Sequence, residues 1–438
     1  MNFAPHHIME SIADAKIAAY EDALRKEPQA PVLMSTVIGL RENSGRTSEE
    51  NIKALKRAWV ERYRLPRMVS TPRSCDPDRP LRIGYVSSDF KHHSAAWQFA
   101  RVMLKHDRDQ FQVYGYQLNP ETDALTERLA EGSSGWRACD KMSPIDIAMK
   151  VREDAIDILV DLCGHCPGLA LPAFTIRPAP IQVAGWGYLA PTYVPEISHV
   201  FADEIVIPPS QRDGFAVLDM DCALAFQPPV YASAVREPPR IKNGYPTFGY
   251  LGRLSKVSDD CLRLWCTALR TIPDARLLLK DKWIDEPGFA DALQLRLREF
   301  GMADDAVELR GRTFHVKHLD AHNDVDVCLD SLPTNGGMTT LEALWMGRPV
   351  VGLCDKSRLN GRVGLSIARA VGGEPVVSIA RGANEFAALC RVVLKMDVPD
   401  TRKALLRSCI VQGVAQRAEA HYRQLWRDWC AGRERVAA

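Results

Sequence analysis

Short apolar runs typical of buried β-strands alternate with helical segments, and this alternation occurs twice along the chain. The first half contains runs of this kind at about 81–86, 111–116 and 156–162, with helical segments between them. The pattern restarts in the second half with runs at about 247–251 and 275–279. Strands that alternate with helices form parallel β-α-β units, so the pattern predicts an α/β fold with two parallel sheets.

Two proline-rich segments, at 66–80 and 228–246, divide the chain. We therefore predict a helical extension over 1–75, a first α/β domain over 80–235 and a second over 240–438. Two such domains joined by a hinge favour a ligand cleft between them, with the chemistry at the carboxyl ends of the strands.

The extension is predicted to contain two helices. Helical periodicity covers about 8–28, where Pro28 ends the pattern. A second helix is expected from Thr47 or Ser48, either of which can cap it, to about Tyr63. A packing role without chemistry is the simplest interpretation of this part.

Composition excludes several classes of protein. The 438 residues include 46% hydrophobic and 25% charged residues, which is typical of a globular protein and not of a disordered one. A formal net charge of +1 argues against a nucleic-acid partner. No apolar run is long enough to span a membrane, and no secretory signal is visible at the N-terminus, so we expect a cytoplasmic protein.

The strongest local signal for a ligand is a glycine turn that opens a helix. Gly336 and Gly337 free the backbone after a strand, and Thr339 and Thr340 follow at the helix start. The N–H groups and the dipole of a helix N-terminus suit a phosphate, and Glu342, one turn into the helix, could accept hydrogen bonds from a ribose. No lysine follows the glycines, so this is no Walker A loop. A plain capped helix is the alternative.

Two further groups of residues follow strands. Arg253 and Lys256 come after the strand at 247–251 and could neutralise a diphosphate, although a solvated loop is the alternative. His92 and His93 follow the first strand and could transfer protons. Adjacent side chains point apart and no second ligand pattern accompanies them, so we expect no metal site.

Cys163 and Cys166 form a C-x-x-C pair, which raises the possibility of a thiol oxidoreductase. Such a pair normally opens a helix, whereas here a buried strand precedes it and Pro167 and Gly168 follow. A redox function would need a measurable thiolate near neutral pH. The other ten cysteines are expected to be buried, reduced thiols.

Three stretches make the chain recognisable: LRIGYVSSDF at 81–90, RPAPIQ at 177–182, and DVCLDSLPTNGGMTTLEALWMG at 326–347. Together they resemble the O-GlcNAc transferase / SPINDLY family of glycosyltransferases, from about residue 15 to the final helix. Residues 18–24 look like the end of one tetratricopeptide repeat, of which family members usually carry many. The resemblance implies a GT-B architecture, in which two Rossmann-like domains face a cleft and hold a nucleotide-sugar without a metal or other cofactor.

The resemblance also implies roles by position. Lys256 matches a lysine that contacts the diphosphate, and His318 matches a histidine near the uracil. Thr339 matches a phosphate-binding threonine, and Glu342 falls at the acidic ribose contact. The donor site is therefore predicted to contain Arg253, Lys256, His318, Asn335, Gly336, Gly337, Thr339, Thr340 and Glu342.

Two histidines of the first domain are implied as cleft residues. His93 matches the histidine of the family's S-S-D-F-x-x-H stretch, next to the sugar and the acceptor. His165 falls on a Gly-His-Thr motif, in which Cys166 replaces the threonine. We therefore predict His93, His165 and Lys256 as the residues closest to the chemistry.

The predicted function is that of an inverting, metal-independent glycosyltransferase. It would move GlcNAc or another hexose from a nucleotide diphosphate-sugar to a protein or peptide hydroxyl, or to a small-molecule acceptor. His318 favours a UDP-sugar. The alternative is a catalytically weak nucleotide-sugar-binding interaction module, which two departures from the family pattern favour: Met338, which removes a hydroxyl, and the altered segment 187–193.

Overall fold

A computed structural model describes residues 8–68, 74–166, 170–397 and 400–437, which form two compact units. Pro167 and Gly168, and residues 69–73 of the first proline-rich segment, lie outside the described residues. Each unit combines described residues from three separate stretches of the chain. Unit 1 comprises those of Met1–Ala19, Leu40–Glu49 and Pro228–Ser408, and unit 2 comprises those of Tyr20–Gly39, Glu50–Gln227 and Cys409–Ala438.

Unit 2 is built on a seven-stranded parallel sheet in the order β3-β2-β1-β4-β5-β6-β7. Its strands are β1 (Leu81–Ser87), β2 (Phe111–Gln117), β3 (Gly135–Ala138), β4 (Ile158–Asp161), β5 (Ile181–Ala184), β6 (His199–Ala202) and β7 (Ala216–Asp219). The connecting helices are α4 (Ala96–Lys105), α5 (Ala124–Glu131), α6 (Pro144–Glu153) and α7 (Leu171–Thr175). The strand order reverses between β1 and β4, so the loops after these two strands border a topological switch point.

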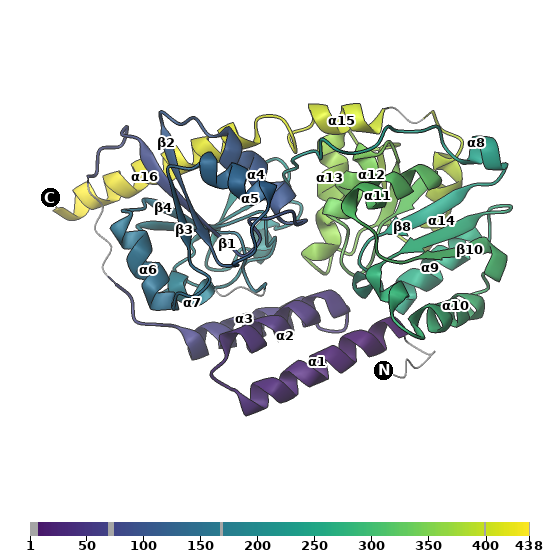
Figure 1. The fold of residues 1–438 in the computed structure, drawn as a ribbon, viewed down its shortest axis with the longest axis horizontal. Helices are drawn as coiled ribbons and strands as arrows, with labels where there is room; N and C mark the ends of the chain where they lie inside the picture. Colours follow the sequence, from purple (N-terminus) through teal and green to yellow (C-terminus); the bar gives the residue numbers. More distant parts are fainter. Residues whose placement is uncertain (1–7, 69–73, 167–169, 398–399, 438) are drawn as a thin grey trace. The chain divides into compact units, whose positions relative to one another are not determined.

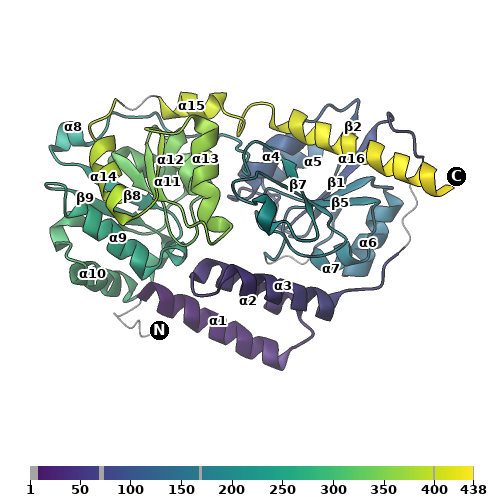
Figure 2. The ribbon, with the colours of Figure 1, turned by 180° about the vertical axis from the view of Figure 1, so that it is seen from behind.

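The last helix, α16 (Val414–Ala437), completes the core of unit 2 (Figure 2). Tyr422 and Trp426 are fully buried there, and the hydroxyl of Tyr422 lies 3.0 Å from that of Tyr85 on β1. The predicted range 240–438 placed this helix with the second domain. The structure differs because the apolar face of α16 packs against the sheet of unit 2.

Unit 1, in which Figure 1 labels β8 and β10, contains a six-stranded parallel sheet in the order β10-β9-β8-β11-β12-β13. The strands are β8 (Thr247–Leu251), β9 (Arg276–Lys280), β10 (Val307–Arg310), β11 (Val327–Leu329), β12 (Val350–Leu353) and β13 (Val377–Ala380). The helices are α8 (Arg240–Asn243), α9 (Asp259–Leu269), α10 (Phe289–Glu299), α11 (His315–Asp320), α12 (Met338–Trp345), α13 (Val363–Val371), α14 (Ala383–Val393) and α15 (Thr401–Arg407). Here the order reverses between β8 and β11, and this places a second switch point between the strands that precede Lys256 and Gly336. The predicted α/β class with two Rossmann-like sheets is confirmed.

Three helices precede the sheets: α1 (Ile8–Lys26), α2 (Pro31–Ser44) and α3 (Glu49–Tyr63). The sequence predicted α1 and α3 but not α2. Apolar residues occur on most sides of α2, so it lacks the single stripe by which an amphipathic helix is recognised. Its first residue, Pro31, occupies a position that favours a helix start, and its carbonyl accepts a hydrogen bond of 3.1 Å from the indole of Trp59.

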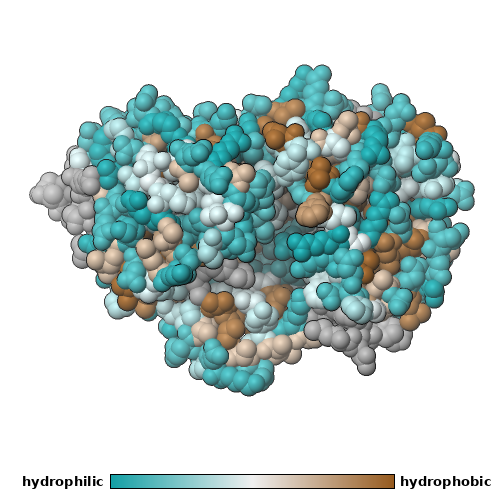
Figure 3. All heavy atoms as spheres, viewed as in Figure 1, coloured by the Kyte–Doolittle hydropathy of each residue, from teal (hydrophilic) through white to brown (hydrophobic). Residues whose placement is uncertain are grey.

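The surface in Figure 3 is mostly hydrophilic, with hydrophobic side chains in small separate groups. No helix in the described part of the chain is long and apolar enough to cross a membrane.

Candidate functional site

The two donor segments predicted for unit 1 lie side by side at the carboxyl ends of β8 and β11. Val257, the neighbour of Lys256, pairs with Pro333 in an isolated antiparallel bridge. A β-carbon added at Gly252 would lie 3.1 Å from Cγ2 of Thr339. The fold therefore brings the cation-bearing loop against the start of α12.

Tyr250, on β8, holds the loop that carries Arg253 and Lys256 in place. Its buried hydroxyl donates to the carbonyl of Arg253 at 3.1 Å and lies 3.3 Å from Oγ of Ser331. The side chain of Arg253 is exposed and that of Lys256 is half-buried, so both cations lie at the edge of the sheet.

The N-terminus of α12 has the features of an anion site. Gly337 precedes the helix and supplies no side-chain cap, so the N–H groups of the first turn can serve a ligand. Thr339 is half-buried, whereas Thr340 is buried and its hydroxyl donates to the carbonyl of Gly336 at 2.9 Å. Of the two threonines, Thr339 has the hydroxyl better placed for a phosphate.

Asn335 and Gly336 hold the loop together. The amide nitrogen of Asn335 donates to the carbonyl of Ser331 at 3.0 Å, and its oxygen accepts from the N–H of Gly364 at 3.2 Å. The N–H of Gly336 donates to Oδ1 of Asp330 at 2.5 Å. Both residues were predicted as donor contacts, and in the structure their polar groups shape the loop.

Asp330 was not predicted as a site residue, yet it lies at the centre of this loop. Its Oδ1 accepts from the N–H groups of Ser331 and Gly336, while Oδ2 is buried with no hydrogen-bond partner among the described residues. Burial raises the pKa of Asp330 to about 7, and the nearby charge of Lys256 acts in the opposite direction. An acidic residue that directly follows a buried strand is the signal that could have identified it.

Glu342 is buried and paired with two histidines of α11. Its Oε1 lies 2.9 Å from Nε2 of His315, and its Oε2 lies 3.7 Å from Nε2 of His318. Burial alone would raise the pKa of Glu342, but the interactions with His315 and His318 hold it well below its usual value. The structure therefore brings the predicted residues Glu342 and His318 together.

Two residues near Glu342 were not predicted as site residues from the sequence. His315 precedes His318 by three residues, so the two lie on the same side of α11, with ring centroids 6.0 Å apart. Tyr231 belongs to the proline-rich segment, and its hydroxyl lies 2.8 Å from Nδ1 of His315. The His-x-x-His spacing could have indicated His315, whereas no local pattern indicates Tyr231.

In unit 2, His93 and His165 follow β1 and β4, at the switch point, but their environments differ. The side chain of His93 is 48% exposed, and its Nδ1 lies 3.5 Å from Oδ1 of Asp89. His165 is 1% exposed, with Nδ1 at 3.2 Å from Oγ of Ser35 and Nε2 at 3.3 Å from the carbonyl of Thr192. Burial, assisted by the charge of Lys56, lowers the pKa of His165 to about 3. His165 was predicted as a cleft residue, and in the structure its ring is enclosed within unit 2.

The thiol pair is poorly placed for redox chemistry. Cys163 is buried, and its sulfur accepts from the N–H of Ser88 at 3.2 Å. Burial raises the pKa of the Cys163 thiol well above its usual value, which disfavours the thiolate. Seven of the other ten cysteines are buried.

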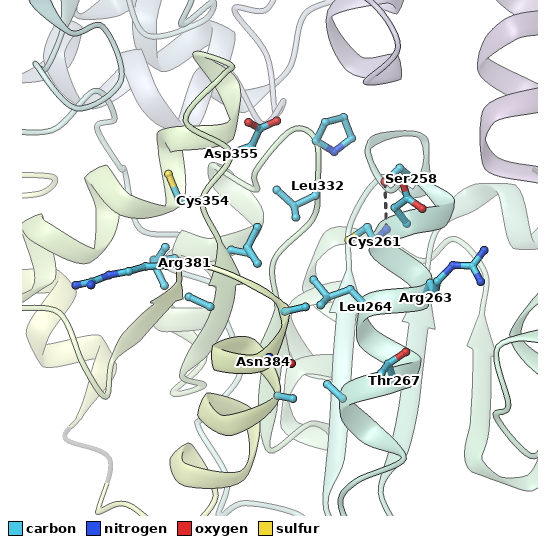
Figure 4. A pocket seen from close by; sticks show the side chains of 18 of the residues that line it. Ser258, Cys261, Arg263, Leu264, Thr267, Leu332, Cys354, Asp355, Arg381 and Asn384 are labelled. Carbon is cyan, nitrogen blue, oxygen red and sulfur yellow. Dashed lines mark hydrogen bonds between the residues drawn. The ribbon is translucent and has the colours of Figure 1, made fainter.

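An open pocket of about 1520 Å³ lies between α9 and α14 of unit 1 (Figure 4). Leu264 and Leu332 line its middle, while the guanidinium groups of Arg263 and Arg381 point outward on opposite sides. None of the predicted site residues lines this pocket, so it is separate from the candidate donor site. Across residues 8–68, 74–166, 170–397 and 400–437, no group of three or more His, Cys, Asp or Glu side chains could hold a metal ion.

Comparisons with known proteins agree with this architecture. A profile of glycosyl transferase family 41 matches residues 58–226 and 240–411. The probable UDP-N-acetylglucosamine–peptide N-acetylglucosaminyltransferase SPINDLY of Arabidopsis thaliana is 31% identical over 399 residues, which cover 86% of this chain and 43% of the relative. The protein of the same name from Petunia hybrida is 30% identical over 408 residues, covering 88% and 43%. The chain thus spans less than half of the length of these plant relatives.

Among solved structures, a mutant of the O-GlcNAc transferase of Thermobaculum terrenum superimposes with a TM-score of 0.89. It is 31% identical in sequence, and the match covers 98% of this chain and 83% of that one. Sucrose-phosphate synthase of Thermosynechococcus elongatus, at 13% identity and a TM-score of 0.51 over 79% of this chain and 99% of its own, shares the fold alone.

Proposed function

Because the chain belongs to glycosyl transferase family 41, we propose that it transfers a sugar from a nucleotide diphosphate-sugar to a hydroxyl group of a protein or peptide. UDP-N-acetylglucosamine is the donor in the names of the plant relatives, and His318 beside Glu342 is consistent with a uridine nucleotide. A peptide acceptor is named in the same relatives, of which the chain spans less than half.

The observation that carries the proposal is the convergence of Lys256, the start of α12 and Glu342 at one switch point. A departing nucleoside diphosphate gains negative charge as the bond to the sugar breaks. A lysine ammonium and the N–H groups of a helix N-terminus stabilise such charge without a metal ion or another cofactor. Glu342 lies one turn further along α12, where it can meet the ribose.

The proposed reaction inverts the anomeric centre. The acceptor hydroxyl attacks the anomeric carbon on the face opposite the diphosphate, the bond from that carbon to the phosphate oxygen breaks, and the diphosphate leaves with the electron pair. The hydroxyl proton is released, and His93 is our candidate for positioning the acceptor or relaying that proton. His165 would first have to give up its contacts with Ser35 and Thr192.

A catalytically weak binding module is the second candidate. It is favoured by the internal use of the Asn335 amide, the Gly336 N–H and the Thr340 hydroxyl, which leaves fewer donors for the phosphates. Release of UDP from UDP-GlcNAc, measured with and without peptide acceptors, separates the two, because a catalytically weak binding module releases little or none.

The donor is tested by thermal shift with UDP, GDP and their sugars. UDP at millimolar concentration should stabilise the fold by about 1–3 kcal/mol if its Kd is roughly 10–100 μM. A clear shift with GDP and none with UDP would contradict the uridine assignment.

A further inference from the structure

Tyr231 lies on the surface of unit 1, yet its hydroxyl is engaged. Its side chain is 38% exposed, and its ring meets that of His315 edge-on, at a centroid distance of 5.8 Å. Partial burial, together with the charge of Glu342, raises the pKa of Tyr231 to about 12. The hydroxyl therefore keeps its proton near neutral pH and can donate it to Nδ1 of His315, 2.8 Å away.

When His315 is neutral, the hydrogen bonds from Tyr231 through His315 to Glu342 all run in one direction. The carboxylate of Glu342 can only accept, so the hydrogen on the 2.9 Å contact belongs to Nε2 of His315. A neutral imidazole that carries its hydrogen on Nε2 has an acceptor at Nδ1, and this acceptor is met by the hydroxyl of Tyr231. Tyr231 thus holds the ring of His315 at Nδ1 while Nε2 donates to Glu342.

The second oxygen of Glu342 is less tightly held. Oε2 lies 3.7 Å from Nε2 of His318, which is beyond ordinary hydrogen-bond distance. A carboxylate oxygen that has no close donor can accept a hydrogen bond from a ligand hydroxyl.

We propose that Tyr231 is a positioning residue for the ribose of the donor, acting through His315 to orient the carboxylate of Glu342. The inference rests on the proposed function, because it assumes that a ribonucleoside diphosphate binds beside α12. Without the Tyr231 hydroxyl, Nδ1 of His315 loses its partner and the ring is held from one side only, so the carboxylate of Glu342 is oriented less firmly. The loss should then fall on recognition of a ribose hydroxyl and not on binding in general.

The test is titration calorimetry with UDP, 2′-deoxy-UDP and 3′-deoxy-UDP. The wild type should bind UDP about 10-fold or more tightly than the analogue that lacks the recognised hydroxyl, the scale for one hydrogen bond to a charged group. Tyr231→Phe should weaken UDP binding by about 3- to 10-fold and leave binding of that analogue unchanged, so that the discrimination shrinks. His315→Gln, which breaks the same connection from the other end, should shrink the discrimination as well.

Tyr245→Phe is the matched control. This tyrosine belongs to the same unit, and its ring lies under the guanidinium of Arg276 at 4.0 Å, away from Glu342. It should leave the affinities for UDP and for both analogues unchanged.

The outcomes separate this inference from the function on which it rests. If Tyr231→Phe weakens UDP and both analogues equally, or weakens none of them, Tyr231 does not orient the ribose contact and the inference fails alone. If the folded wild type binds no UDP, the uridine assignment fails and takes the inference with it. Melting temperatures of all variants establish that each is folded.

Discussion

His165→Gln separates a structural role of this histidine from a catalytic one. The ring of His165 is enclosed: it meets Trp59 edge-on at a centroid distance of 5.4 Å, and its nitrogens face Ser35 and Thr192. Glutamine keeps a donor and an acceptor but loses the ring contacts. We expect it to lower the free energy of unfolding at pH 7.5 by about 2–3 kcal/mol, the range for losing buried packing and weakening two hydrogen bonds.

The contribution of His165 to the free energy of unfolding depends on pH. The pKa of His165 is lowered to about 3 in the folded protein, whereas an unfolded histidine titrates near 6.5. Its stabilising contribution is therefore present above about pH 6.5 and is lost as the pH falls toward 3. Between pH 7.5 and 5.0 the wild type should lose about 2 kcal/mol through this residue alone, and the glutamine variant should not. The deficit of the variant should nearly vanish at pH 5.0.

Urea unfolding of the wild type and of His165→Gln, followed by circular dichroism at both pH values, measures the difference in their free energies of unfolding. The transition to analyse is the one that the substitution shifts. His92→Gln is the control, because the side chain of His92 is 43% exposed and its pair with Asp123 is worth less than about 1 kcal/mol. Equal pH dependence in the wild type and His165→Gln would refute the burial of a neutral imidazole. A loss of kcat of about 100-fold or more in a folded variant would return His165 to the reaction, since such losses mark general acid-base groups.

Three other predictions concern the donor site. Lys256→Ala should lower kcat by about 10²–10³-fold with little change in melting temperature. Lys256→Arg should recover only part of the lost kcat, because a planar guanidinium does not replace the compact charge of an ammonium group. Near-normal kcat in a folded Lys256→Ala protein would place the diphosphate elsewhere. EDTA should leave turnover unchanged, and activity that is lost in EDTA and restored by Mg²⁺ or Mn²⁺ would contradict the metal-free mechanism. Asp330→Asn tests the raised pKa of about 7: wild-type stability from this group is present below about pH 4 and is lost as the pH rises through 7. Between pH 5 and pH 8 the difference in free energy of unfolding should therefore move in favour of the asparagine variant by about 2–3 kcal/mol, and an unchanged difference would show that Asp330 titrates normally.

The alternation of strands and helices predicted the central strands of both sheets, because strands buried on both faces appear as continuous apolar runs. It missed β3, β7 and β13, which lie at the edges of the two sheets and are only four residues long; in β3, Arg137 also interrupts the apolar pattern. At the site, the burial of a side chain is what the sequence could not predict. The Gly-His motif after a strand predicted where His165 lies in the chain. The ring is enclosed because segments that are distant in sequence pack around it.

The surroundings of Glu342 also depend on contacts between distant segments. Its place in α12 follows from the glycine turn before it, and its histidine partners come from a helix that precedes β11. Tyr231 comes from a segment with no regular pattern, so only the three-dimensional structure brings its hydroxyl to His315. Contacts between segments that are far apart in sequence are the part that no local pattern encodes.

The position of α16 in the core of unit 2 bears on how the protein is made. Tyr422 and Trp426 fill space between groups that were synthesised more than three hundred residues earlier, such as Tyr85. During translation the sheet of unit 2 must therefore wait, with an apolar face uncovered, until the final helix has left the ribosome. A nascent chain of this kind is exposed to aggregation for most of its synthesis, and a stop codon before α16 would leave that face permanently open.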